Sequence, residues 1–204
     1  GKGKRRRSAM AFKIGILGTG VMAGRMADTI VQMQEAEVYA VASRSEEKAQ
    51  EFGKKYGAKK CYGSYDALME DPDVEMIYIA APNHLHYQQA RACIVNEKPV
   101  LLEKPFTLNE QQAQALIDLA EMHQVFLCEA MWVRFMPLLH YLKRELENEK
   151  IGEVTSVMAD IGYDLKEKER VNRLDMGGGA LLDIGVYPIT LALAVLGKDI
   201  DNIS

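Results

Sequence analysis

Three side chains in this sequence have the chemistry to move a proton beside a reacting carbon, and Lys104 is the first of them. It follows two leucines and Glu103 and precedes Pro105, whose ring restricts the backbone. Lys104 is therefore expected at the end of a strand, partly desolvated, where its charge can assist a reaction. An ordinary surface lysine paired with Glu103 fits the same spacing equally well.

Asp183 and Tyr187 are the other two side chains, and they stand in an apolar run after the glycines at 177–179. Their separation of four residues would place both on one face of a regular helix. Polar groups among apolar neighbours are costly unless they have partners, which favours a functional pair. A buried structural pair that caps the glycine loop is the alternative. Pro188 is expected to kink the helix.

A glycine-rich turn near the start of the chain indicates a bound nucleotide. The pattern Gly18-x-Gly20-x-x-Ala23 follows an apolar stretch and precedes a helical one. Gly18 permits the turn, Gly20 lets the backbone approach a pyrophosphate, and Ala23 or Gly24 lets the helix pack closely, with its N–H groups facing the anion. The pattern predicts a dinucleotide site, although a glycine turn in any parallel α/β protein is the alternative.

The residues after the second apolar stretch bear on which dinucleotide is bound. An acidic residue about 20 positions after the glycines would hold the ribose 2′-hydroxyl of NAD. This sequence instead has Ser43-Arg44-Ser45, and a hydroxyl with a planar guanidinium suits a 2′-phosphate. NADP(H) is therefore predicted in preference to NAD(H). A helix N-cap at Ser43 or Ser45 explains the same residues, and the two roles are compatible.

Asn83 and His86 follow the fourth apolar stretch, on the same expected edge. The pair His84-x-His86 could begin a metal site, but no other ligand stands at zinc spacing. A hydrogen-bonding role is predicted for these histidines, and no metal is expected.

These side chains need a scaffold that brings them to one edge. From Ala11 onward, short β-rich stretches alternate with helical patterns, which predicts parallel βαβ units. Right-handed crossovers then place the carboxyl ends of the strands on one edge of a doubly wound parallel sheet. The expected strands are Phe12–Leu17, Glu37–Ala42, Lys60–Tyr62, Met76–Ala80, Pro99–Leu102 and Val125–Cys128, with helices at Val21–Met33, Glu46–Tyr56, Tyr65–Glu70, His84–Asn96 and Glu110–His123.

The sequence pattern changes after Ala130. A helix is expected over Leu138–Glu149, a longer strand over Val154–Tyr163, a charged loop over Asp164–Asp175, and an apolar helix ending near Leu196. A single strand cannot form a sheet, so residues 130–204 are expected to be an incomplete domain.

Composition narrows the class of protein. With 48% hydrophobic and 26% charged residues among 204, the chain has the composition of a globular enzyme. Its uninterrupted apolar runs fall far below the ~20 residues that cross a bilayer, so no membrane span is expected.

Residues 1–9 are interpreted as a cloning remnant or a disordered head, and the charge of −4 becomes −9 without its five cations. Cys61, Cys93 and Cys128, odd in number and widely spaced, predict reduced thiols in a cytoplasmic protein.

Five motifs together resemble the glucose-fructose oxidoreductase, inositol dehydrogenase and rhizopine catabolism (Gfo/Idh/MocA) family. Their order is Gly18-x-Gly20-x-x-Ala23, Ala81-Pro-Asn83-x-x-His86, Glu103-Lys104-Pro105, Trp132-x-Arg134-Phe135-x-Pro137 and Gly178-Gly-Ala-Leu-Leu-Asp183-Ile-Gly-Val-Tyr187. The Trp-x-Arg-Phe segment and Tyr187 look most like the branch of the dimeric dihydrodiol dehydrogenases and NADP-dependent D-xylose dehydrogenases.

The resemblance implies an NADP-dependent dehydrogenase or reductase that transfers a hydride between nicotinamide C4 and a hydroxyl or carbonyl carbon of a sugar, cyclic diol or related compound. Lys104 would lie between nicotinamide and substrate, Tyr187 would donate or accept the proton, and Asp183 would orient the substrate hydroxyl. A tyrosine hydroxyl gives up its proton near neutral pH only beside a cation, which Lys104 would supply. Which of the two finally holds the proton stays open.

The resemblance also implies a Rossmann domain at 10–129 and, at 130–204, the beginning of an α+β substrate and dimerisation domain with a mainly antiparallel open sheet. Trp132 and Arg134 would help to enclose the cofactor. A small-molecule substrate and a homo-oligomer of the intact protein are expected, without nucleic acid or membrane. The residues expected to bind the cofactor are Gly18, Thr19, Gly20, Val21, Met22, Ser43, Arg44, Lys48, Ala81, Pro82, Asn83, His86, Glu103, Lys104, Trp132 and Arg134.

Two other functions fit parts of the sequence. A non-catalytic dinucleotide-binding or regulatory module, or an inactive fragment, is the first alternative. Nucleic-acid binding through the basic residues at 2–7 is the second, and the acidic remainder of the chain argues against it.

Overall fold

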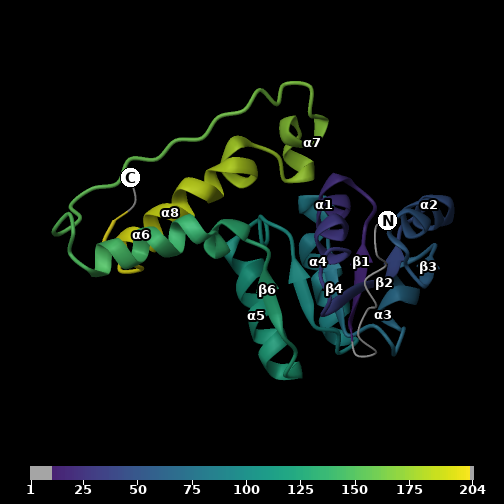
Figure 1. The fold of residues 1–204 in the computed structure, drawn as a ribbon. Helices are drawn as coiled ribbons and strands as arrows, with labels where there is room; N and C mark the ends of the chain where they lie inside the picture. Colours follow the sequence, from purple (N-terminus) through teal and green to yellow (C-terminus); the bar gives the residue numbers. More distant parts are fainter. Residues whose placement is uncertain (1–10, 203–204) are drawn as a thin grey trace. The chain divides into compact units, whose positions relative to one another are not determined.

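The computed structural model describes residues 11–202, drawn as a coloured ribbon in Figure 1. The chain divides into two compact units, one ending at Glu129 and one beginning at Ala130. The basic head interpreted above, residues 1–9, lies outside the described residues.

The first unit is a six-stranded parallel sheet in the order β3-β2-β1-β4-β5-β6 (Figure 1). Its strands are β1 (Phe12–Leu17), β2 (Ala36–Ala42), β3 (Lys60–Tyr62), β4 (Met76–Ile79), β5 (Val100–Leu102) and β6 (Leu127–Glu129). The strand order reverses between β1 and β4, and ligands of doubly wound sheets bind where that reversal occurs. The predicted Rossmann sheet is confirmed.

Five helices accompany the strands. They are α1 (Val21–Ile30), α2 (Glu46–Tyr56), α3 (Tyr65–Met69), α4 (His86–Val95, after a 3₁₀ turn at Asn83–Leu85) and α5 (Glu110–His123). The helix α1 ends before the predicted Met33, because the N–H groups of Gln32 and Met33 bond to carbonyls three residues back. The strand β6 begins after the predicted Val125, because the Val125 N–H bonds to Ala120 O of α5, at 2.9 Å.

The core lies between the strands and their helices. Every residue of β2 is buried, and Ile16, Ile77 and Leu102 are 0% exposed. Buried faces of this kind are why parallel strands have nearly continuous apolar sequences. Packing of these buried strand residues therefore holds the carboxyl ends of the strands in place.

A polar network ties the strands together at the opposite, amino-terminal side. Lys60 Nζ lies 3.0 Å from Asp71 Oδ1 and 3.2 Å from Asp73 Oδ2. Tyr39 OH donates to Asp73 at 2.9 Å, and Tyr62 OH donates to Asp71 at 2.8 Å. These bonds connect β2 and β3 to the loop that enters β4. The hydrogen bond from Tyr39, with those from two lysines, lowers the pKa of Asp73 to about 2.

The second unit is helical in its described part, residues 130–202. Its helices are α6 (Pro137–Glu147), α7 (Glu169–Asn172) and α8 (Val186–Leu196), with 3₁₀ turns at Trp132–Phe135 and Leu174–Met176 and a π-helical turn at Leu181–Gly185. The predicted strand at Val154–Tyr163 is wrong, because the described chain supplies no second strand to bond its backbone, and Met158 is 97% exposed.

One helical run is long and apolar enough to cross a membrane by length and composition. It covers Leu174–Leu196, with a mean hydropathy of 1.9 and 11% of its window buried. The expectation of no membrane span rested on uninterrupted apolar runs, and it stays a prediction, since length and composition alone do not show a span. Core helices of water-soluble proteins pass the same test, and this run contains the glycines at 177–179 and the buried, ion-paired Asp183.

Candidate functional site

The turn between β1 and α1 has the geometry of a pyrophosphate cradle. Gly18 has φ +108°, and a Cβ atom there would lie 2.7 Å from the Ala80 carbonyl oxygen, so only glycine fits. A Cβ on Gly20 would meet nothing within 4 Å, so the protein's own packing does not require this glycine. The open space beside Gly20 is where a bound group could approach the backbone closely.

The amino end of α1 supports the same reading. Gly20 is its N-cap and supplies no side-chain cap to the first N–H groups of the helix. Val21 and Met22 form the exposed first turn, and Val21 is 76% exposed, whereas Ala23 is fully buried against the sheet. Uncapped N–H groups at a helix start bind phosphate, so these residues fit a dinucleotide.

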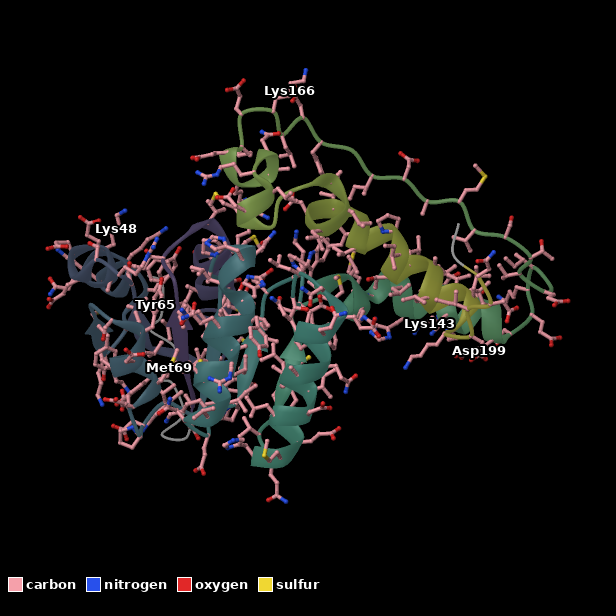
Figure 2. The ribbon with its side chains drawn as sticks, turned by 180° about the vertical axis from the view of Figure 1, so that it is seen from behind. Lys48, Tyr65, Met69, Lys143, Lys166 and Asp199 are labelled. Carbon is pink, nitrogen blue, oxygen red and sulfur yellow. The ribbon has the colours of Figure 1, made fainter. Side chains whose placement is uncertain are left out.

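Two exposed cations, Arg44 and Lys48, lie in the loop after β2 and in the first turn of α2. Arg44 makes no side-chain hydrogen bond or ion pair within residues 11–202, and the same holds for Lys48, whose side chain lies at the surface in Figure 2. Ser45, not Ser43, caps α2, because its Oγ accepts from Lys48 N at 3.3 Å. The buried Ser43 Oγ accepts from Ser45 N at 3.3 Å. The N-cap interpretation holds for Ser45 and leaves Arg44 available to a phosphate.

The loop after β4 contains both histidines of the His-x-His pair. The ring of His86, 1% exposed, has Nδ1 2.7 Å from Pro105 O and Nε2 2.9 Å from Ala81 O. Burial lowers the pKa of His86, against the effect of these two hydrogen bonds. Each ring nitrogen faces a carbonyl oxygen of the protein itself, and the predicted contact of His86 with a cofactor stays a prediction. His84 Nδ1 is buried without a hydrogen-bond partner in the described chain.

Residues 11–202 contain no group of three or more histidine, cysteine or acidic side chains placed to hold an ion.

The loop after β5 presents Lys104 from a buried base. Glu103 is 7% exposed, and its carboxylate accepts from Tyr78 OH at 2.6 Å and from Lys104 N at 3.2 Å. Burial raises the pKa of Glu103, although both hydrogen bonds oppose that shift. Burial and the neighbouring Glu103 raise the pKa of Tyr78 well above its usual range. Lys104 is partly buried, as predicted, rather than an exposed surface lysine.

These loops meet at one edge of the sheet. Leu17 of β1 pairs with Ala42 of β2 and Ile79 of β4, which pairs with Leu102 of β5. Backbone bonds from Gly18 N to Ala42 O and from Ala80 N to Leu17 O join the loops themselves. The structure therefore brings together the predicted residues of the first unit.

The second unit holds Asp183 and Tyr187 by separate contacts. Tyr187 Oη accepts from Trp132 Nε1 at 3.2 Å, with the two rings edge to face at 5.8 Å. Asp183, 3% exposed, pairs with Arg170 NH1 at 2.7 Å. Trp132 and Arg134 lie together in the 3₁₀ turn at 132–135, and their contact with a cofactor remains a prediction.

One detail of this unit differs from the sequence expectation. Asp183 lies in the π-helical turn, so the four-residue spacing to Tyr187 does not give the shared face of a regular helix. The π-helical turn ends at Gly185, three positions before Pro188, where a kink was expected, and α8 continues through Pro188. Gly178 is packed so closely that a Cβ would lie 2.5 Å from Val171 O.

Sequence reasoning missed two residues, Tyr78 and Arg170. Tyr78 was counted only as part of an apolar strand, and Arg170 stood among several charged residues of the predicted loop at 164–175. The sequence offered one signal for Tyr78: a tyrosine within an apolar strand, with an acidic residue directly after the next strand. Nothing in the local pattern singled out Arg170.

The chain was compared with known families and proteins. Residues 12–130 match the oxidoreductase family with an NAD-binding Rossmann fold, and residues 139–204 match the Gfo/Idh/MocA C-terminal domain. Trans-1,2-dihydrobenzene-1,2-diol dehydrogenase of Xenopus tropicalis is 36% identical over 195 residues, covering 93% of this chain and 58% of the relative. The corresponding Mus musculus enzyme is 34% identical, covering 92% and 57%. The chain therefore spans somewhat more than half the length of these relatives.

Solved structures agree with this assignment. A 3-ketoreductase from Actinomadura kijaniata, in complex with NADP and TDP-benzene, has a TM-score of 0.81 and 30% identity, over 92% of this chain and 58% of the other. A putative NADPH-dependent oxidoreductase from Desulfitobacterium hafniense has a TM-score of 0.82 and 28% identity, over 94% and 56%. From these matches and the geometry above, the chain belongs to the Gfo/Idh/MocA family of oxidoreductases.

Proposed function

We propose that the intact protein is an NADP-dependent oxidoreductase that transfers a hydride between nicotinamide C4 and a hydroxyl or carbonyl carbon of a sugar, cyclic diol or related compound. The observation that carries the proposal is the partly buried Lys104, anchored through Glu103 at the same sheet edge as the glycine turn. The dihydrodiol dehydrogenases and the NADP-bound 3-ketoreductase among its relatives support it.

Each group of residues has a task in this reaction. The nicotinamide, when bound, supplies or accepts the hydride. The open backbone at Gly20 and the uncapped N–H groups of α1 would hold the pyrophosphate, and Arg44 with Lys48 would hold the 2′-phosphate. Lys104 would stabilise the charge that develops on the substrate oxygen, and Tyr187 Oη would pass a proton to or from that oxygen.

Asp183 has a more restricted role than the family resemblance implied. Its carboxylate is already paired with Arg170. Asp183 would therefore orient a substrate hydroxyl either while it keeps this ion pair or after the ion pair breaks. Glu103, buried beneath Lys104, keeps an acidic group close to the lysine without exposing it to water.

The proposal is tested by turnover of the intact protein. A panel of aldoses, dihydrodiols and dicarbonyl compounds, assayed with NADP(H), should identify a substrate through the absorbance change of reduced nicotinamide. Lys104→Ala should abolish that turnover while changing NADPH affinity by no more than a few-fold. Unchanged turnover in Lys104→Ala would remove Lys104 from the reaction.

A non-catalytic dinucleotide-binding module is the second candidate. The specific observation in its favour is the ion pair of the buried Asp183 with the half-exposed Arg170, which occupies a carboxylate that catalysis would use. It predicts NADPH binding, seen as a change in fluorescence, without turnover of any member of the panel.

Three further properties are proposed for the intact protein. A cytoplasmic location is supported by Cys61, Cys93 and Cys128, all free thiols in the structure.

A homodimer is proposed from the resemblance to the dimeric dihydrodiol dehydrogenases, and the molar mass measured by light scattering tests it. Absence of nucleic acid and membrane partners is supported by the acidic balance of the chain, and sedimentation with vesicles tests the apolar run at Leu174–Leu196.

A further inference from the structure

The ring of His86 joins two loops of the candidate cofactor edge. His86 is the first residue of α4 and is 1% exposed. Its two nitrogens lie 2.9 Å from the carbonyl of Ala81, in the loop after β4, and 2.7 Å from that of Pro105, in the loop after β5. One buried side chain therefore lies between two loops whose contacting residues, Ala81 and Pro105, are 24 positions apart in the sequence.

A second connection holds the other side of Lys104. The Lys104 N–H donates to the Glu103 carboxylate at 3.2 Å, and that carboxylate accepts from Tyr78 OH of β4 at 2.6 Å. Pro105, on the opposite side of Lys104, is the residue bonded to His86. The backbone of Lys104 is thus fixed before and after the residue, in both cases by groups that belong to β4 or α4.

The imidazole directs both of its nitrogens at the backbone of the protein itself. Both ring nitrogens face carbonyl oxygens, which only accept, so a neutral ring donates to one of them and an imidazolium donates to both. Burial, with smaller contributions from the neighbouring Lys104 and His84, lowers the pKa of the ring, and its contacts with the two carbonyls oppose that shift. In either protonation state, His86 acts on the site through the backbone that it holds.

We propose that His86 is a positioning residue for Lys104. By holding the backbone beside Lys104, His86 sets the rate of hydride transfer without itself touching cofactor or substrate. The proposal rests on the proposed function, in which Lys104 takes part in the reaction. A misplacement of about 1 Å can reduce a rate about 100-fold. Loss of one of the two connections is therefore expected to lower kcat by about 10- to 100-fold.

The test uses His86→Phe, which keeps an aromatic ring and removes both nitrogens, and His86→Gln, whose amide can bond to carbonyls. We expect His86→Phe to lower kcat by about 10- to 100-fold and to change the NADPH Kd by less than about threefold. His86→Gln should have a kcat between those of His86→Phe and wild type. Ile94→Ala is the matched control, because Ile94 is fully buried near the far end of α4 and should lower stability without lowering kcat.

Several outcomes would overturn the proposal. They are an unchanged kcat in His86→Phe, a loss expressed as weaker NADPH binding with kcat retained, or an equal loss of kcat in Ile94→Ala. If His86→Phe does not fold, His86→Gln decides: a lowered kcat with retained NADPH affinity supports the proposal, and an unchanged kcat overturns it. Lys104→Ala, measured alongside, separates the two hypotheses, because retained turnover there refutes the proposed function itself.

Discussion

Replacement of Gly18 by alanine is expected to destabilise the first unit strongly. The residue has φ +108°, and the new Cβ would lie 2.7 Å from the Ala80 carbonyl oxygen. A strained backbone conformation costs about 1–3 kcal/mol, and overpacking against a backbone atom costs a similar amount. Together they predict a loss of about 2–6 kcal/mol, which is a large share of the roughly 5–15 kcal/mol that stabilises a typical domain.

Gly20→Ala is the matched control for this prediction. Gly20 has φ −80°, and a Cβ there meets nothing within 4 Å, so the free energy of unfolding should change by less than about 1 kcal/mol. The added methyl group should instead obstruct the pyrophosphate and weaken NADPH binding. Urea unfolding followed by circular dichroism, with NADPH titration by fluorescence, measures both effects. Equal stability of the two variants would refute the steric argument, and unchanged NADPH affinity in Gly20→Ala would refute the cradle.

Three more outcomes are expected. Arg44→Ala should weaken NADPH by at least about tenfold, since a charge-assisted bond contributes about 1.5–3 kcal/mol, and should change NADH binding little; equal losses would exclude the 2′-phosphate role. Because the pKa of Asp73 is lowered to about 2, its contribution to stability is present above its ordinary pKa of 3.8 and is lost as pH falls towards 2, so Asp73→Asn should flatten this part of an acid-unfolding curve. Arg170→Ala should cost about 1–3 kcal/mol by removing the ion pair of the buried Asp183, while Arg170→Lys should retain part of that stability in thermal unfolding.

Local patterns in the sequence were sufficient to predict the sheet and the edge of it that carries the candidate site. Apolar β-rich stretches separated by helical periodicity define βαβ units, and handedness then places the strand ends together. The turn at Gly18 and the cations at Arg44 and Lys48 could be found because backbone conformation and charge are visible in residue type.

The parts that sequence reasoning missed depend on contacts between distant residues. The hydroxyl of Tyr78 bonds to an acid 25 positions away, and His86 bonds to a carbonyl 19 positions away. The alternation at Val154–Tyr163 has the period of a strand but does not supply a partner strand. The spacing of Asp183 and Tyr187 assumed a regular helix, which the π-helical turn interrupts.

The contact between Trp132 and Tyr187 provides an optical probe of the second unit. The sequence contains one tryptophan, so all indole emission from this chain comes from the side chain that donates to Tyr187 Oη. Trp132 is 52% exposed, and a ligand that covers its indole or breaks this hydrogen bond would shift the emission. Substrate binding near Tyr187 could therefore be followed in the unlabelled protein, before any turnover is detected.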